Sequence, residues 1–334
     1  MSQTTPTPTY AGYQEFLGSY ERHQWTGGLP VVPPTPALVE RFLAHLGLPP
    51  GDVVARAVGV ELTAEELVEH SILAGCAPES LSLVIAAMRS HLARVKPGIE
   101  KTPGWAETAL ALIVNGPVRR ELGIASEQAC MGPGWASNAS IGRALNFATR
   151  AVYQRIGVVG VPAFSSPDTY SFCFGEDEEN SPWEPMHVER GFPLESSTAT
   201  VQSVLASLPS LDASSRTPEG VLDTLAKCMD RRASLGGRWP GHTLNTTFVV
   251  CKEVQRVFEE ARWSKARFRD YLWDKIKQRK GPGAENLGDP KDSLIVAAGG
   301  AGMQWIWVLV SNDLAPVTIM VEPSGMAEPT GGTR

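Results

Sequence analysis

The sequence lacks both a long hydrophobic run and an excess of basic residues. Its longest apolar stretch, residues 294–310, is interrupted by Gly299, Gly300 and Gln304, whereas a membrane-spanning helix needs about 18 or more consecutive apolar residues. The formal charge is −6 over 334 residues, so no basic surface for nucleic acid is expected. These absences argue against a membrane protein and against a nucleic-acid-binding protein.

Several motifs of well-known enzyme classes are also missing. The five cysteines include no C-x-x-C pair, which argues against a zinc knuckle, a disulfide framework and a local redox pair. There is no P-loop, no G-x-G-x-x-G that opens a helix after the first strand, and no G-x-S-x-G elbow of a serine hydrolase. No motif indicates a cofactor, and a metal ion stays an open alternative. Residues 1–10 are polar and unlike a signal peptide, so we expect a cytoplasmic protein.

What the sequence does contain is a regular alternation of helical and strand patterns. This alternation predicts an α/β fold with mixed or parallel sheets and flanking helices. A capping box formed by Thr63 and Glu66 predicts a helix from residue 64. The order of elements in residues 80–174 recurs in residues 218–309, which raises the alternative of two structurally duplicated halves.

The two passes contain the same kinds of element in the same order. The first has helix 80–95, strand 110–114, helices from 118 and over 141–156, and strands 158–161 and 170–174. The second has helix 218–232, strand 247–250, helices 254–261 and 265–277, and strands 294–298 and 304–309. We therefore expect an N-terminal tail (1–26), an N-terminal α/β half (27–195), a C-terminal α/β half (196–325) and a tail (326–334), with a ligand site in the cleft between the halves.

Cys130 is the first candidate nucleophile. It stands in a loop with Gly132 and Gly134, shortly before Asn138 and the expected helix over 141–156. The positive end of a helix dipole favours the thiolate form of cysteine. The pattern therefore predicts a reactive thiol, with a small apolar filler beneath a turn as the alternative.

The other cysteines are further candidates or structural residues. Cys76 stands immediately before a helix start, and Cys173 lies in an aromatic strand, where it faces either a cleft or the core. Cys228 lies within a helix and Cys251 at a strand end, so both are expected to be structural.

A proline-stiffened acidic segment, residues 176–191, is the densest polar cluster of the sequence. Stiffness suits a site that must hold a histidine and a carboxylate in place. His187 is a candidate general acid or base, or a metal ligand together with Glu176 or Glu184.

Substrate-binding candidates come from the same regions. Arg143 and Arg190 could hold a substrate carboxylate in a two-pronged contact. The remaining candidates for substrate binding are Gly132, Gly134, Asn138 and Trp183. The glycine run at 299–302 predicts a tight turn between strands, with a cradle for phosphate or carboxylate as the alternative.

Five stretches of the chain match motifs of one protein family. They are G-L-P-V-V-P-P-T (28–35), A-G-C-x-P-E (74–79), L-I-V-N-G-P-[VI]-x-x-E-L-G (112–123), C-x-G-P-G-x-x-x-N-A-[ST]-I-G-R-A (130–144) and Y-x-[FY]-C-F-x-E-[ND]-E-E-x-S-P-W-E-P-x-H-V-E-R-G-F (170–192). With these motifs, most of residues 28–195 resembles an uncharacterised bacterial protein family that accompanies small UGSC-type proteins, which carry a cysteine or selenocysteine in a thiol-active motif.

The resemblance implies one subunit of a thiol- or selenol-dependent enzyme with a small thiol or selenol protein as its partner. The candidate residues inside the family motifs are Cys76, Cys130, Cys173, Glu176, His187 and Arg190. The chain departs from the family at Ala136, at Gln304 and over 207–210, where polar or histidine-like residues are expected. If those groups are catalytic, this chain has a changed substrate or has lost activity.

Three functions stay open from the sequence. The first is an enzyme, an oxidoreductase or a lyase, that uses the Cys130 thiolate on a small anionic substrate and cleaves a carbon–heteroatom bond, with His187 as acid or base. The second is a metal-dependent lyase or hydratase with cysteine and histidine ligands. The third is a non-catalytic subunit that binds a partner through surface aromatics such as Trp183. All three predict a homo- or hetero-oligomer.

Overall fold

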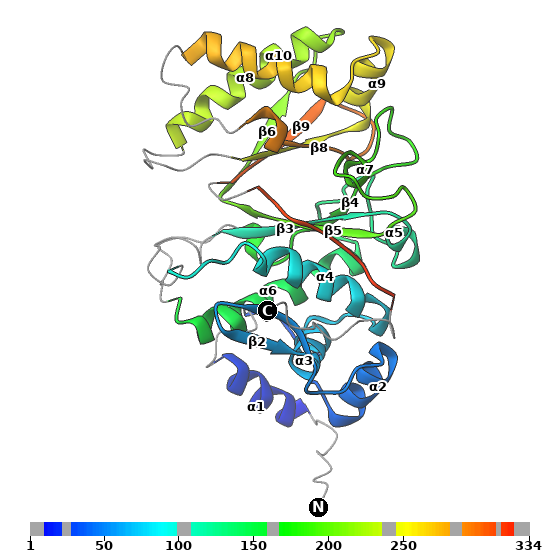
Figure 1. Ribbon diagram of the computed structural model, residues 1–334, viewed down its shortest axis with the longest axis vertical. Helices are drawn as coiled ribbons and strands as arrows, with labels where there is room; N and C mark the ends of the chain where they lie inside the picture. The colour runs from blue at the N-terminus through cyan, green and yellow to red at the C-terminus, as the bar shows by residue number, and fades with distance from the viewer. Residues whose placement is uncertain are drawn as a thin grey trace, which may run out of the picture.

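The molecule is built of four layers, with two β-sheets stacked face to face between two layers of helices (Figure 1). The computed structural model describes residues 10–21, 28–98, 108–158, 167–235, 245–280, 289–311 and 315–323. Within these ranges, an α/β fold with mixed sheets and flanking helices is confirmed. No helix of the described residues is both long enough and apolar enough to cross a membrane.

The first sheet has the strand order β10-β5-β3-β4. Its strands are β3 (Ala109–Asn115), β4 (Cys173–Gly175), β5 (Thr198–Val204) and β10 (Thr318–Met320). It is covered on its outer face by α4 (Leu81–Leu92) and α6 (Ala136–Ile156), and α3 (Ala64–Ala74) packs on α6 (Figure 1). Beyond them lie α1 (Tyr10–Glu21), α2 (Pro36–Leu46) and the antiparallel hairpin of β1 (Val53–Ala57) and β2 (Val60–Thr63).

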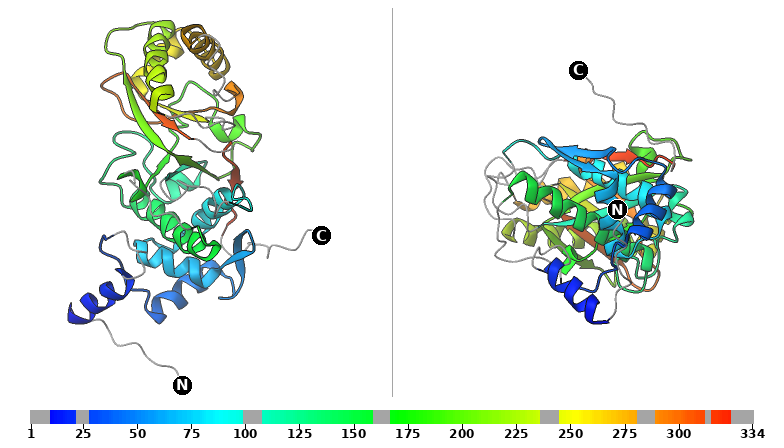
Figure 2. Two further views of the ribbon diagram at one scale, coloured as in Figure 1. Left: turned by 90° about the vertical axis from the view of Figure 1, so that its left-hand side faces the viewer. Right: turned by 90° about the horizontal axis from the view of Figure 1, so that it is seen from below.

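The second sheet has the strand order β6-β9-β7-β8. Its strands are β6 (Ala206–Leu211), β7 (Thr246–Val250), β8 (Leu294–Ala297) and β9 (Trp305–Val310), and its outer face carries α8 (Pro218–Leu235), α9 (Lys252–Glu260) and α10 (Lys265–Lys280). Figure 2 shows these helices at the end of the molecule opposite to α1. Two short helices, α5 (Val118–Glu121) and α7 (Met186–Glu189), lie in loops of the first sheet.

The side-chain pattern of the central strands explains the stacking of two sheets. All seven residues of β3 are buried. Leu110 and Leu112 pack among the helices of the first layer, whereas Ala111 and Ile113 pack against Val249 and Leu309 of the second sheet. Because successive side chains of a strand point to opposite faces, a strand that is apolar at every position needs a partner on both sides.

The two sheets repeat one topology, and each takes an edge strand from the other half. β3 pairs parallel with β4 and antiparallel with β5, as β7 pairs parallel with β8 and antiparallel with β9. The strand after β5, which is β6, joins β9, and β10, which follows β9, joins β5. The strand order therefore supports duplicated halves. The expected boundary at residue 195 does not separate the sheets, because β5 lies after it and belongs to the first sheet.

Individual elements differ from the expectations in their extent. Helix α6 begins at Ala136, five residues before the expected start, and the aromatic strand is reduced to Cys173–Gly175. The expected strand at 158–161 falls mostly outside the described residues. The capping box is confirmed, since the backbone N–H of Glu66 donates to Thr63 and the N–H of Thr63 donates to the Glu66 carboxylate.

Candidate functional site

The carboxyl ends of parallel strands from both sheets meet at one edge of the sandwich. β4 is followed by Glu176, and β8 ends at Ala297. The backbone N–H of Asp177 donates to the carbonyl of Ala297 with an N···O distance of 2.7 Å, so the loop after β4 is tied to the end of β8. Ligands of α/β proteins commonly bind outside the carboxyl ends of strands. This edge is therefore the candidate functional site.

A pocket of about 440 Å³ opens at this edge beside the loop of residues 298–302, and we call it the glycine-loop pocket. Its other lining residues are Gln128, Met131, Val249, Cys251, Met303, Trp305 and Trp307. No lining residue carries a charged side chain, so neutral donors, which are backbone amides and the side chains of Gln128 and the tryptophans, have to bind any anionic group of a ligand. Within the described part of the chain, the N–H groups of Gly300 and Ala301 make no hydrogen bond, which leaves both available to an anion.

Cys251 lies in the wall of this pocket and is the N-cap residue of α9. Its thiol donates to the carbonyl of Met303, with S···O 3.1 Å, and its sulfur accepts the N–H of Trp305 at 3.1 Å. The structure thus places at the cavity a cysteine that the sequence analysis expects to be structural.

Cys130, the expected nucleophile, is 2% exposed and does not line the pocket. Burial raises the pKa of its thiol to about 11, although backbone N–H groups of Cys130, Met131 and Gly299 act in the opposite direction. The negative charge of Asp177 raises this pKa further. Burial therefore disfavours the thiolate that the sequence predicts at Cys130, and the role of Cys130 as nucleophile stays a prediction. Helix α6 begins at Ala136, and the dipole effect is confined to about one turn of the helix end.

Glu176 joins four elements of the site from a completely buried position. One carboxylate oxygen, Oε2, accepts hydrogen bonds from Asn115 Nδ2 at 2.6 Å and from the N–H of Met186 at 2.7 Å. The other, Oε1, lies 3.5 Å from Lys265 Nζ and 3.4 Å from the N–H of Ala297. Glu176 therefore fixes the end of β3, the start of α7 and the end of β8 relative to α10.

Glu178 and Arg119 form a second buried pair behind Glu176. Arg119 Nη2 lies 2.8 Å from Glu178 Oε2, and the two side chains are 4% and 9% exposed. The second oxygen of Glu178 accepts the N–H of Gly116 at 2.7 Å and Asn115 Nδ2 at 2.9 Å. Because every acceptor has a donor, this pair stabilises the loop after β3 and not a bound ligand.

His187 is also completely buried. Its Nε2 lies 3.2 Å from the carbonyl of Leu194, and since a carbonyl can only accept, Nε2 carries the proton. Nδ1 lies 3.7 Å from Glu178 Oε1 and forms no hydrogen bond with a described residue. His187 does not line the glycine-loop pocket, so the structure does not bring it together with Cys130 or Cys251 as an acid–base partner.

A second cavity, of about 570 Å³, lies on the other side of the segment 176–191, against α9 and α10. Trp183, Glu184 and Lys265 line it together with Glu189. Lys265 Nζ is held between Glu176 and Glu189, 3.5 and 3.4 Å from their nearest oxygens. Burial acts to raise the pKa of Glu189, but the hydrogen bond from Arg269 and the charge of Lys265 outweigh it, and the pKa lies below its ordinary value.

Both expected anion-binding arginines are used within the protein. Arg143 donates to the carbonyls of Pro30 and Leu29 at 2.6 and 3.0 Å. Arg190 donates to Thr318 Oγ1 and to the carbonyl of Pro316, each at 2.6 Å. Arg143 therefore anchors the Pro-rich segment before α2, and Arg190 anchors the segment that carries β10.

The residues expected around Cys130 shape its loop. The side-chain amide of Asn138 accepts the N–H of Ala125 at 2.9 Å and donates to the carbonyl of Cys130 at 3.0 Å. Gly132 and Gly134 are exposed, and Gly134 has a φ of 109°, a conformation that L-residues rarely adopt. None of these three lines the glycine-loop pocket.

The remaining candidates lie in the core. Cys76 and Cys173 belong to the cluster beneath α6, and burial raises the pKa of both thiols, that of Cys76 to about 11. Trp183 is 7% exposed, and its Nε1 donates to the carbonyl of Trp263 at 2.8 Å. The expectation that Trp183 is a surface aromatic is wrong, because it packs edge-on against Phe258 and Phe268.

Sequence reasoning missed several residues of this edge. They include Asn115, Arg119, Gln128, Asp177, Glu178, Cys251, Lys265 and Trp305. The signal that could have found Cys251 is its position at a strand end directly before an amphipathic helix, since proximity to a helix start also made Cys76 and Cys130 candidates.

Comparison with protein-family models gives no match, and comparison with curated proteins gives none. The family resemblance therefore stays a prediction. Among the described residues, no group of three histidine, cysteine or acidic side chains is placed to hold a metal ion, so the geometry offers no support for the metal-dependent alternative.

Proposed function

We propose that this protein is an enzyme, or the subunit of an enzyme, that uses a cysteine thiol on a small anionic molecule bound in the glycine-loop pocket. The observation that carries the proposal is the position of Cys251 in the wall of that pocket, at the first turn of α9. Cys251 takes the role that the sequence analysis assigns to Cys130, because Cys251 lines this cavity and Cys130 does not.

The surroundings of the pocket suit a substrate with an apolar body and one anionic group. Trp305, Trp307 and Met303 supply apolar walls. The amides of Gly300 and Ala301 are the groups that can bind a carboxylate next to the thiol. In the first step, the sulfur of Cys251 forms a bond to a substrate carbon, the carbon–heteroatom bond breaks, and the thiol proton leaves with the heteroatom or to water.

Alkylation of the native protein with two reagents of the same size tests this proposal. Iodoacetamide is neutral and iodoacetate is anionic, and each replaces iodide with the cysteine sulfur. All four of Cys76, Cys130, Cys173 and Cys251 are buried, but only Cys251 among them lines the pocket, so we expect Cys251 to react first. Partly exposed Cys228 is the internal reference, and peptide mass spectrometry gives each rate.

The ratio of the two alkylation rates tests whether the pocket prefers an anionic substrate. We expect the iodoacetate-to-iodoacetamide rate ratio to be higher at Cys251 than at Cys228, because the loop amides attract the carboxylate. A Cys251 that reacts only when the protein unfolds would refute the thiol function. An equal ratio at both cysteines would retain the thiol and refute the anionic substrate.

A second candidate is a subunit whose partner covers the same edge. Trp135 and Met303 are 41% and 49% exposed, and they stand on loops that meet where Gly299 donates to Ser126. Sedimentation of the wild type should then give a mass above 36.0 kDa, and Trp135→Lys should lower it. Leu194→Lys, at a residue 63% exposed, is the control that should leave the mass unchanged.

A further inference from the structure

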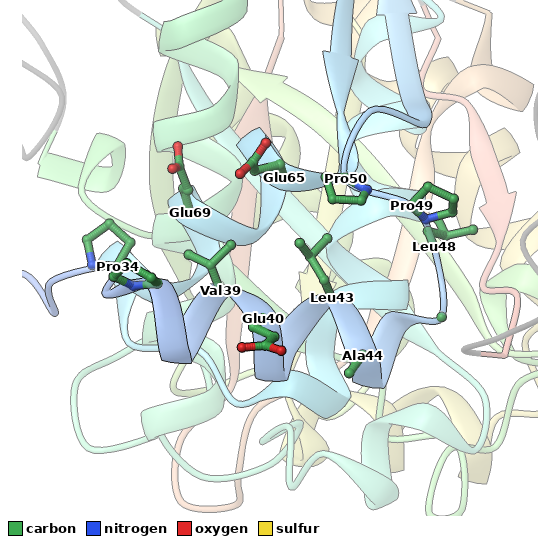
Figure 3. A pocket seen from close by; sticks show the side chains of 12 residues that line it. Pro34, Val39, Glu40, Leu43, Ala44, Leu48, Pro49, Pro50, Glu65 and Glu69 are labelled. Carbon is green, nitrogen blue, oxygen red and sulfur yellow. The ribbon is translucent and has the colours of Figure 1, made fainter. Parts of the chain in front are cut away.

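A groove runs between α2 and α3 (Figure 3), and these helices lie in the layer farthest from the second sheet (Figure 1). Its volume is about 780 Å³, and its floor is apolar, with Val39 and Leu43 from α2 and Leu48 from the following turn. Prolines close both ends, Pro34 and Pro36 at one and Pro49 and Pro50 at the other. The groove is separate from the glycine-loop pocket, and its binding properties are independent of the proposed function.

Carboxylates stand on both sides of the groove. Figure 3 shows Glu65 and Glu69 on the α3 side and Glu40 on the α2 side. None of the three forms an ion pair with a residue that the structure describes, whereas neighbouring Glu66 pairs with Arg155 at 2.9 Å. Burial raises the pKa of Glu69, and the charges of Glu65 and Glu66 add to the effect. Glu65 and Glu69 therefore repel each other, and a cation placed beside them would relieve the repulsion.

The length of the groove favours a peptide segment over a compact small molecule. The groove follows α2 from the prolines before it to the turn after it. Eleven residues of helix correspond to about 16 Å at about 1.5 Å per residue. An amphipathic helix of similar length can lay its apolar side chains on Val39 and Leu43 and direct basic side chains to the carboxylates, which is a common mode of peptide recognition.

We propose that this groove binds a basic amphipathic segment of a partner protein. The apolar floor supplies the contact area, and the unpaired carboxylates select Lys or Arg over Asp or Glu in the partner. The occupant is a polypeptide, because a compact cation would leave most of the apolar floor exposed to water.

Fluorescence anisotropy on the full chain tests the proposal with two labelled helical peptides of about 11 residues. One peptide carries Leu on one face of the helix and Lys on the opposite face. The other peptide carries Glu in place of Lys. We expect the Leu/Lys peptide to bind and the Leu/Glu peptide not to bind. Equal binding of both peptides, or no binding of the Leu/Lys peptide, would overturn the proposal.

Two variants locate the binding site. Replacement of both Glu65 and Glu69 by Gln should weaken binding of the Leu/Lys peptide by between about 2-fold and 30-fold, the range expected for two exposed charge pairs. The matched control replaces Glu259 and Glu260, exposed on α9 at the far end of the molecule, and should change nothing. An equal loss in both variants would show attraction by net charge alone and would overturn the proposal.

A third variant tests the apolar floor. Leu43→Asp should abolish binding of the Leu/Lys peptide, although it adds a negative charge, and circular dichroism at 222 nm checks that the variant is folded. Tighter binding by Leu43→Asp would mean that charge alone binds the peptide. Competition by spermidine at equal charge concentration should be weak, and full displacement would identify a small polyamine site instead.

Discussion

Replacing Glu176 by Gln should destabilise the protein more than any other removal of a single charge at the candidate site. The carboxylate accepts donors on both oxygens, from Asn115 and Met186 on Oε2 and from Ala297 and Lys265 on Oε1. A glutamine amide presents one oxygen and one NH₂ group. Either orientation therefore directs an N–H at other N–H groups in a buried position.

The less costly orientation keeps the oxygen on the side with the 2.6 and 2.7 Å hydrogen bonds. It then leaves buried Lys265 paired with Glu189 alone. A buried polar group without a partner costs about 1–3 kcal/mol, and breaking a buried ion pair costs about 3–5 kcal/mol. Because Glu189 still lies 3.4 Å from Lys265, we expect Glu176→Gln to lower the free energy of unfolding by about 3 kcal/mol.

Thermal unfolding followed by circular dichroism measures this loss. At about 2.1 cal/mol/K per residue, unfolding of a chain of this length has an entropy of about 0.7 kcal/mol/K, so 3 kcal/mol lowers the Tm by about 4 °C. Glu184→Gln is the matched control, because Glu184 is exposed on the same segment, and it should lower the Tm by less than about 1 °C. Equal Tm values for the two variants would refute the assignment of Glu176 as the buried junction of the site.

Two further predictions concern stability. Burial, and then the charge of Arg94, lowers the pKa of His91 well below its ordinary value. The stability that neutral His91 provides is therefore present above about pH 6.5, and it is lost as the pH falls below that value. Urea unfolding at pH 7.5 and 5.5 should show a smaller loss for His91→Gln than for the wild type, and an equal loss would contradict this. Gly116 and Gly123 both have positive φ, but an added Cβ would collide with the backbone at 2.1 Å only at Gly116. Gly116→Ala should therefore cost more than about 3 kcal/mol and Gly123→Ala about 1–2 kcal/mol, and similar urea midpoints for the two would show that the close approach is absent.

Local sequence patterns determined those helices whose start or extent depends on residues that are close in the sequence. The capping box at Thr63 fixes the start of α3, and the apolar periodicity after residue 80 fixes α4. These features depend on residues that are close in the sequence and therefore interact with one another whatever the tertiary structure is. The repeated order of helices and strands suggested duplicated halves, but it matched strand 170–174 with strand 304–309, whereas in the sheets β4 is equivalent to β8 and β5 to β9.

The stacking and the exchange of strands could not be obtained in this way. β6 pairs with β9 across about a hundred residues, and β10 pairs with β5 across a similar separation. Nothing in the few residues of β10 specifies which sheet they join. The sheet that β10 joins depends on which strand edges the rest of the folded chain leaves unpaired.

The character of the candidate residues was decided by tertiary structure for the same reason. Cys130 and Cys251 both stand at loop-to-helix junctions in the sequence, and both are buried in the structure. Burial, and then the charge of Asp177, raises the pKa of the Cys130 thiol, whereas Cys251 lines a pocket made of two distant loops. Exposure and the proximity of charges set the chemistry of a side chain, and both are properties of the packed chain. The sequence by itself thus determined the locally encoded elements, and the packing of the two sheets decided that Cys251, and not Cys130, lines a pocket.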